Sequence, residues 1–182
     1  MQQQEIIQLV EGCKKQNQKA QLALYDMFYR AMYNTALRIV QDKMLAEDIM
    51  QEAFITVFAK IESLDEVITF PKWLKQIVVN KSLNFLKKEK RFTSLEMSSL
   101  KEEVDDGFWS VEETKDVKQI ILAINDLKEN YRVLLTLYYI EGYDYEEIVQ
   151  ITGFTHVNCR TLLSRAKKSL QKKMQPCLKA II

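Results

Sequence analysis

The stretch DYEEIVQITGFTHVNCRTLLSRA, residues 144–166, predicts two helices joined by a tight turn. Asp144 is a suitable N-cap, and Glu147, three positions later, would complete a capping box. Gly153 stands where the first helix needs a left-handed residue to end, and Thr155 can cap the helix that follows. A short helix, a glycine turn and a longer second helix form the helix-turn-helix layout.

The second helix of this pair, predicted over residues 157–174, is strongly basic. Residues 155–175 hold six Lys and Arg and no Asp or Glu. Its first turns carry donors and acceptors suited to base edges in the major groove, and the lysines suit phosphates. A solvated cationic surface helix is the alternative, but the capping box, the glycine turn and the absence of acids together favour DNA binding. The predicted DNA-binding residues are Thr155, His156, Asn158, Arg160, Thr161, Ser164, Arg165 and Lys168, and the lysines expected to neutralise phosphates are Lys167, Lys168, Lys172 and Lys173.

Upstream, the chain predicts three long helices that pack as a bundle. In residues 19–40 apolar side chains recur at three- and four-residue steps, and Asp42 can cap the helix that follows. Residues 62–69 break the pattern, and Pro71 then suits the first turn of a third helix over residues 73–90. The predicted inward-facing residues are Leu22, Tyr25, Phe28, Tyr29, Met32, Ala36 and Ile39 in the first helix, Ile49, Met50, Ala53, Phe54, Val57, Phe58 and Ile61 in the second, and Leu74, Ile77, Val78 and Phe85 in the third.

A linker is expected between the two halves of the chain. Residues 92–113 lose helical periodicity and contain Ser, Asp, Glu and a glycine, a composition typical of solvated linkers. Phe108 and Trp109 within this segment either dock on a neighbouring helix or bind a partner. We therefore expect one domain over residues 1–91 and a second over residues 114–182.

Composition agrees with an all-α fold of two small helical domains. The chain has 182 residues, of which 47% are hydrophobic and 28% charged, with only four glycines and two prolines. So few turn residues exclude an all-β protein. Gly142 is expected to end the second of the C-terminal helices, which are predicted over residues 117–127, 129–140, 145–151 and 157–174.

Several classes of protein are excluded by what the sequence lacks. The start, MQQQEIIQLVEG, has no cationic segment followed by an apolar core, and no window has the apolar length of a membrane span. We therefore expect a cytoplasmic protein that does not insert into membranes. Cys13, Cys159 and Cys177 are widely separated, which predicts free thiols rather than disulfides or a zinc site.

Charge is segregated along the chain although the net charge is only +1. Residues 71–91 hold seven Lys and Arg against one Glu, in addition to the basic C-terminal helix. Residues 41–70 hold seven acids against two bases, and residues 96–116 hold eight against two. Two cationic faces separated by acidic intervals indicate a polyanionic ligand and a separate cationic partner.

The third helix combines lysines with amide and aromatic side chains. Asn80, Asn84 and Trp73 could read or stack on unpaired bases while lysines follow the backbone. The alternative is a solvated helix with Trp73 in the core, and on this helix alone that alternative is favoured. The predicted DNA-binding residues are Lys72, Lys75, Asn80, Lys81, Asn84, Lys87 and Lys88.

The second helix carries an acidic patch, because Asp48, Gln51 and Glu52 lie within one turn and project together. Paired carboxylates also occur in general acid–base catalysis and in metal sites. We discount both, because His156 is the only histidine and the chain has neither a Gly-rich phosphate loop nor Cys/His ligand spacing. We therefore expect a docking patch for a basic partner, with no catalytic residue, metal, cofactor or small-molecule substrate.

These segments resemble the bacterial sigma factors. Residues 46–54, AEDIMQEAF, are similar to the family's core-binding helix, and residues 70–74, FPKWL, through Asn80 to its promoter-reading helix. Segments 127–132, 138–142, 145–148 and 165–166 resemble its second DNA-binding domain, in the right order. The resemblance spans residues 19–174. Two domains with a short linker resemble the extracytoplasmic-function (ECF) subgroup.

The resemblance implies a role for each segment. Residues 1–91 would be a sigma region 2-like bundle whose Asp48, Gln51 and Glu52 bind the clamp helices of the polymerase's largest subunit. Asn80 and the loop of residues 62–69 would hold a flipped base of the minus-ten element. Residues 114–182 would be a region 4-like domain that reads the minus-thirty-five element as duplex. Val79, Asn84 and Leu162 depart from the family's usual residues, which bears on the promoter sequence preferred.

The resemblance also implies an anti-sigma factor as a regulatory partner, often one that is anchored in the membrane. Two other functions remain open from the residues themselves. A free-standing helix-turn-helix regulator would bind duplex DNA without polymerase, using its first domain for a ligand or for dimerisation. An enzyme would need a convergent pocket, which the residue inventory does not supply.

Overall fold

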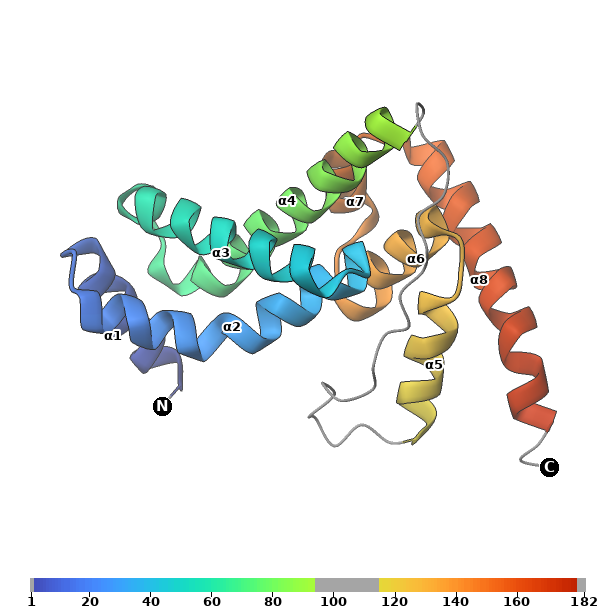
Figure 1. Ribbon diagram of the computed structural model, residues 1–182, viewed down its shortest axis with the longest axis horizontal. Coiled ribbons are helices and arrows are strands. Elements are labelled where there is room, and N and C mark those ends of the chain that lie inside the picture. The colour runs from blue at the N-terminus through green and yellow to red at the C-terminus, as the bar shows by residue number, and fades with distance from the viewer. Residues whose placement is uncertain (1, 94–114, 180–182) are drawn as a thin grey trace. The chain divides into compact units, whose positions relative to one another are not determined.

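The computed structural model describes residues 2–93 and 115–179, and every regular element in these ranges is helical (Figure 1). The chain divides into two compact units, residues 1–100 and 101–182. Each unit is described here by itself. The all-α prediction is confirmed, while Phe108 and Trp109 lie outside the described residues.

Unit 1 is built around one long helix. This helix, α2, packs against α1, α3 and α4, and α3 also packs against α4. Asp42 caps α3 as predicted, its carboxylate accepting a hydrogen bond from the Leu45 amide at 2.8 Å. Pro71 lies in the first turn of α4, also as predicted. The elements are α1 (Gln2–Lys14), α2 (Gln18–Val40), α3 (Lys43–Lys60), the 3₁₀ turns η1 (Ile61–Ser63) and η2 (Val67–Thr69), and α4 (Phe70–Thr93).

The three predicted helices of this unit are present as α2, α3 and α4, but helix α1 was not predicted. Val10 and Cys13 of α1 are buried, and the helix packs against α2. Leu22, predicted to face inward, is 63% exposed, whereas Leu24 is fully buried. Because α2 packs against three helices at once, its buried face is wider than a single stripe and includes Leu24.

Unit 2 contains the predicted helix-turn-helix. Ile148, Leu163 and Ala166 are buried in it, together with Leu134 and Leu137. The Cys159 thiol is also buried in the core, and this burial raises its pKa. The elements are α5 (Lys115–Asn125), α6 (Glu129–Leu135), the π-helical turn η4 (Thr136–Ile140), α7 (Tyr145–Thr152) and α8 (His156–Lys179).

The helix predicted over residues 129–140 is not uniform. It becomes a π-helical turn at Thr136, whose carbonyl accepts a hydrogen bond from the Glu141 amide five residues on. A π-turn holds an extra residue, so it rotates the side chains within and beyond it relative to the α-helical repeat. Gly142 follows in the left-handed conformation, with φ of +79°, as the sequence predicted.

Tyr143 gives unit 2 a pH dependence. Burial, with smaller contributions from Glu141 and Glu147, raises the pKa of its hydroxyl from 10.0 to about 12. The unfolded chain therefore loses this proton at lower pH than the folded chain does. This contribution to stability is fully present below pH 10 and is lost as the pH rises through about 12.

Tyr143→Phe is expected to remove that dependence. The Tyr143 hydroxyl has no hydrogen-bond partner in the described structure, so the substitution should be neutral or slightly stabilising at pH 7.5. At pH 11 the variant should gain roughly 1 kcal/mol more over the wild type. Urea unfolding of the full chain at both pH values, followed by circular dichroism, measures the difference. An equal gain in stability of Tyr143→Phe at both pH values would contradict the raised pKa of Tyr143.

Candidate nucleic-acid interface

The helix-turn-helix is held by reciprocal capping at the start of α7. The Asp144 carboxylate accepts from the Glu147 amide at 2.8 Å, and the Glu147 carboxylate accepts from the Asp144 amide at 3.0 Å. Gly153 ends α7 with φ of +75°, and the Thr155 hydroxyl accepts from the Asn158 amide at 3.2 Å. Both caps and the glycine turn are confirmed as predicted, so local chemistry sets where α8 begins.

Helix α8 separates a buried side from a polar side. Cys159, Leu163 and Ala166 are buried, which orients the helix on its unit. At about 100° per residue, the predicted DNA-binding side chains from Asn158 to Lys168 cover roughly half of the circumference, opposite those three. All eight are exposed: Thr155, His156, Asn158, Arg160, Thr161, Ser164, Arg165 and Lys168.

Three tyrosines that sequence reasoning missed lie against α8. The ring centroids of Tyr138 and Tyr139 are 4.9 Å apart, and those of Tyr138 and Tyr145 are 5.2 Å apart. The Arg160 guanidinium lies 5.9 Å from the Tyr145 ring centroid, a cation–π contact. Lys167 Nζ lies 5.4 Å and 5.2 Å from the Tyr138 and Tyr139 centroids. The tyrosines thus support two basic side chains of the helix.

The lysines of α8 are not equivalent. A hydrogen bond to Tyr139 raises the pKa of Lys167, and Lys173 forms an ion pair with Asp126 of unit 2. Both were expected to neutralise phosphates, but both have partners within their own unit. Lys168 and Lys172 are exposed and have no such partner in the described structure, so they suit phosphate contacts better.

Helix α4 brings most of its predicted residues to one face. At about 100° per residue, Asn80, Asn84, Lys87 and Lys88 share this face with Trp73, which is half-buried. The Trp73 ring is tilted against Phe70, with centroids 6.1 Å apart.

Three predicted lysines of α4 lie elsewhere on the helix. Lys72 and Lys81 lie at the two margins of the face. Lys75 is half-buried on the side where Val79 and Ser82 are buried, so it does not join the others. Val79 is fully buried and belongs to the core rather than to the exposed face.

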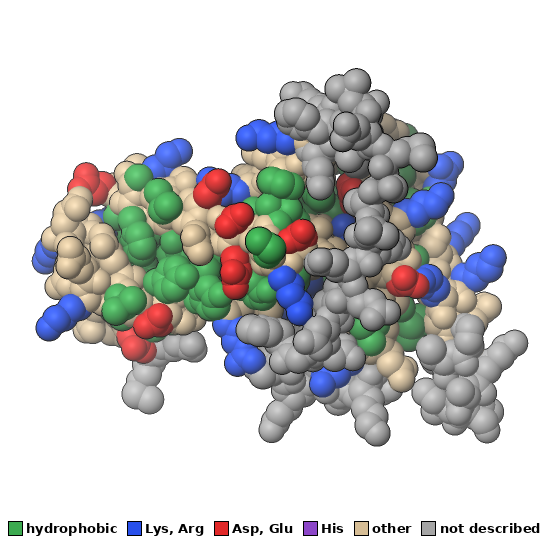
Figure 2. Space-filling model, in the orientation of Figure 1, with side chains coloured by type: hydrophobic (Ala, Val, Ile, Leu, Met, Phe, Trp, Pro, Cys, Tyr) green, Lys and Arg blue, Asp and Glu red, His purple; other side chains and the backbone are tan. Residues whose placement is uncertain are grey.

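Helix α3 exposes the acidic patch and two apolar residues with it. Asp48, Gln51 and Glu52 are all exposed, as predicted. Met44 and Ile55, on the same side of the helix, are 79% and 69% exposed. Figure 2 shows acidic and hydrophobic side chains next to one another over α3. Sequence reasoning missed the apolar pair, although both residues are out of phase with the buried stripe.

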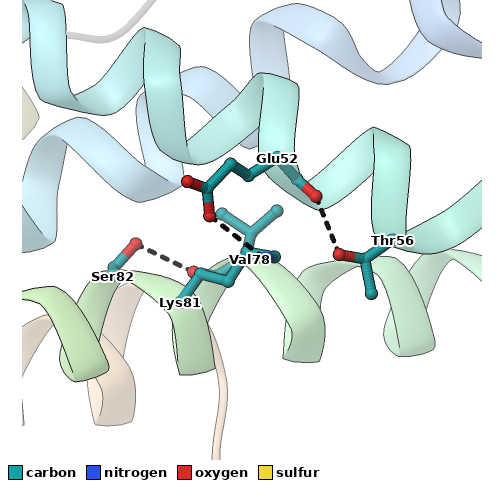
Figure 3. A network of polar contacts seen from close by, with 5 residues as sticks. All are labelled: Glu52, Thr56, Val78, Lys81 and Ser82. Atoms are coloured by element: carbon teal, nitrogen blue, oxygen red, sulfur yellow. Dashed lines mark hydrogen bonds and ion pairs between the residues drawn. The ribbon is translucent and has the colours of Figure 1, made fainter.

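An ion pair connects α3 with α4 (Figure 3). Lys81 Nζ donates to Glu52 Oε2 at 3.2 Å, and the Glu52 side chain is 70% exposed. Nearby, the Thr56 hydroxyl donates to the Glu52 carbonyl and the Ser82 hydroxyl to the Val78 carbonyl. Each of these hydrogen bonds therefore lies within one helix and does not connect α3 with α4. An exposed pair of this kind contributes little to stability, so the carboxylate can exchange partners.

Metal-binding groups and membrane-spanning helices are both absent from the described residues. No group of three or more His, Cys, Asp or Glu that could hold a metal ion occurs among them. Within the same ranges, no helix is long and apolar enough to cross a membrane.

Several known proteins are similar to this chain in sequence and in fold. A family model for sigma-70 region 2 matches residues 24–92, and one for sigma-70 region 4 matches residues 118–170. The ECF RNA polymerase sigma factor SigM of Bacillus subtilis is 28% identical over 149 residues, covering 81% of this chain and 91% of SigM. The ECF RNA polymerase sigma-E factor of Escherichia coli K12 is 27% identical over 182 residues, covering 94% and 95%.

Solved structures agree on the fold. The sigma factor RpoE of Bartonella quintana, crystallised with the anti-sigma factor NepR, superposes with a TM-score of 0.59 at 21% identity, covering 83% of this chain and 94% of that one. CnrH, in complex with the cytosolic domain of CnrY, gives a TM-score of 0.57 at 16% identity, covering 94% and 98%. The two sigma-70 regions lie in the family's order, one in each helical unit. The chain therefore belongs to the ECF sigma factors of the sigma-70 family, which bind core RNA polymerase and promoter DNA to direct transcription initiation and are not enzymes.

Proposed function

We propose that three exposed faces divide the work of this sigma factor. The face of α3 binds core polymerase, α4 with the loop of residues 62–69 holds the minus-ten element, and α8 reads the minus-thirty-five element. The observation that carries this proposal is that the polar residues of each helix lie opposite its buried side, fully exposed on α3 and α8 and partly exposed on α4, where Asn80 is half-buried. Residues 1–91 and 114–182 would then be the two binding domains, joined by residues 92–113.

The α3 face suits a basic helical partner. Asp48, Gln51 and Glu52 offer carboxylate and amide acceptors, and Met44 and Ile55 add apolar area. Interfaces combine apolar anchors with charged groups that set orientation and partner choice. The ion pair with Lys81 would hold the Glu52 carboxylate until a stronger cationic partner replaces it.

The two DNA-binding faces suit different forms of DNA. Duplex readout needs a helix that enters the major groove, and α8 presents Arg160 and Asn158 in its first turns. Unpaired bases need amide hydrogen bonds and stacking surfaces, which α4 offers through Asn80 and Trp73. From this difference we infer that α4 binds the melted minus-ten element and that α8 binds the minus-thirty-five element as duplex.

Regulation by an anti-sigma factor is part of the proposal. The similar protein RpoE was solved with the anti-sigma factor NepR, and the similar protein CnrH with the cytosolic domain of CnrY. A partner of this chain would act by covering the α3 face or the DNA-binding faces.

Two measurements test the proposal as a whole. The chain is mixed with core polymerase and isolated as a complex, and run-off RNA is then sequenced from a promoter library randomised at both elements. Stable holoenzyme and one enriched promoter class are expected. Duplex binding without holoenzyme formation would favour the free-standing regulator instead.

Asn80→Ala is expected to impair the minus-ten step alone. Loss of an amide that holds an unpaired base should slow open-complex formation about tenfold, because one well-made polar contact has about this effect. Affinity of the full chain for a duplex minus-thirty-five fragment should change less than about twofold. Stopped-flow melting and duplex titration measure the two. Equal losses on both substrates would contradict the assigned division.

A further inference from the structure

Helix α1 contacts the loop that is proposed to hold the minus-ten base. It packs against both 3₁₀ turns of that loop, η1 and η2. One hydrogen bond is specific: Lys14 Nζ donates to the Leu64 carbonyl at 2.8 Å, across 50 residues of sequence. Lys14 lies outside the sigma-70 region 2 match, which begins at residue 24.

Contacts within α1 and between α1 and α2 hold Lys14 in place. It stands in the last turn of α1, where the helix dipole favours a cation, and Glu11 Oε1 lies 3.8 Å from its Nζ. A side chain at Gly12 would bring its Cβ to 2.7 Å from that of Ala20, so α1 and α2 approach closely. The corner between these helices is fixed by a hydrogen bond of 3.1 Å from the Asn17 amide to the Gly12 carbonyl. Movement of Lys14 relative to α2 is therefore restricted.

The loop of residues 62–69 has one buried residue, Leu64, whose neighbours are exposed. Leu64 is buried, and its amide donates to the Ile61 carbonyl at 3.2 Å. Its neighbours Ser63 and Asp65 are exposed, as is Ile68 in the second turn. The carbonyl that receives Lys14 thus belongs to the residue that anchors the loop, and a contact there controls where the exposed residues stand.

We propose that Lys14 is a positioning residue, which sets the conformation of residues 62–69 and thereby the preference for the minus-ten base. This inference rests on the proposed function of the loop. Lys14 itself touches no DNA in this account; it acts through the Leu64 carbonyl. The loop would otherwise exchange among several conformations, and a site must be ordered before it can discriminate between bases.

The test compares three variants. Lys14→Met keeps the aliphatic stem and removes the donor, Lys14→Arg restores a donor, and Lys15→Met removes an exposed neighbouring charge as the matched control. Each is assembled with core polymerase and assayed on a promoter panel that varies one minus-ten base at a time. Holoenzyme affinity and duplex minus-thirty-five binding are measured in parallel.

For Lys14→Met we expect discrimination between minus-ten bases to fall about three- to tenfold, the effect of one hydrogen bond from a charged donor. Lys14→Arg should recover most of it, and Lys15→Met should match the wild type. Holoenzyme affinity should change less than about twofold in all three. Hydrogen exchange should accelerate at the Leu64 and Thr69 amides but not within α2, which separates a loosened loop from an unfolded domain.

Three outcomes would overturn the inference. If the wild type and Lys14→Met discriminate equally well between minus-ten bases, the hydrogen bond from Lys14 to the Leu64 carbonyl has no role in discrimination, while the proposed function stands. If Lys14→Met and Lys15→Met lose discrimination alike, general charge rather than the contact is responsible. If the wild-type holoenzyme shows no minus-ten preference, the role proposed for the loop is wrong and the inference falls with it.

Discussion

Reversing the charge of Asp48 and Glu52 together is expected to lower the affinity for core polymerase at least about 100-fold. Each reversal replaces an attraction by a repulsion at the proposed interface, and charged contacts of this kind are commonly worth more than tenfold each. The fold should survive, because both side chains are exposed. A lysine at position 52 would lie near Lys81, but repulsion in water at this exposed site costs little stability.

The control for this experiment reverses Glu5 and Asp26, which are exposed on α1 and α2. This pair changes the net charge by the same amount away from the α3 face. Titration of labelled core polymerase gives the affinity, and circular dichroism gives the helicity. A double variant at Asp48 and Glu52 that forms holoenzyme with wild-type affinity would show that the docking surface lies elsewhere. Equal losses in both double variants would point to overall charge.

Arg160→Ala and Lys172→Ala are expected to fail in different ways. Arg160 lies in the second turn of α8 and its guanidinium contacts the Tyr145 ring; in the proposed function it pairs with a guanine edge. Its loss should relax preference at one promoter position by roughly 1–3 kcal/mol, about 5- to 150-fold. Lys172 is exposed farther along the helix and suits a phosphate, so its loss should weaken all sequences alike and make the salt dependence shallower.

The measurement is duplex affinity over single-base variants of the minus-thirty-five element at several salt concentrations. Lys173→Ala is the informative comparison, because its ammonium pairs with Asp126. It should change DNA affinity less than Lys172→Ala does. Indistinguishable profiles for Arg160→Ala and Lys172→Ala would contradict the orientation proposed for α8 in the groove.

Helix ends and polar faces could be predicted from the sequence because their causes are local. Asp42 and the Asp144–Glu147 capping box act within three residues, and Gly142 and Gly153 adopt positive φ at the expected helix ends. The exposed residues of α3 and α8 were predicted for a similar reason: a helix with one apolar stripe must turn its remaining side chains to water.

Other features were decided by contacts between segments far apart in the chain. Helical periodicity predicted the loop of residues 62–69 only as an interruption, and the resemblance gave it a role, but neither indicated that Lys14 of α1 reaches its Leu64 carbonyl. The π-helical turn places Tyr138 and Tyr139 beside Lys167, which gives that lysine a partner within its own unit. No local pattern encodes either contact.

The sequence by itself determined the all-helical class, the order of the helices from residue 18 to residue 174, and the segments that resemble the sigma factors. Only the tertiary structure decided that α1 joins the bundle, that Leu24 rather than Leu22 is buried, and which lysines of α8 have partners within their own unit. The physical reason is the range of the interactions. Caps and helical periodicity act within a few residues, whereas burial and long side-chain contacts depend on which distant helix occupies the neighbouring space.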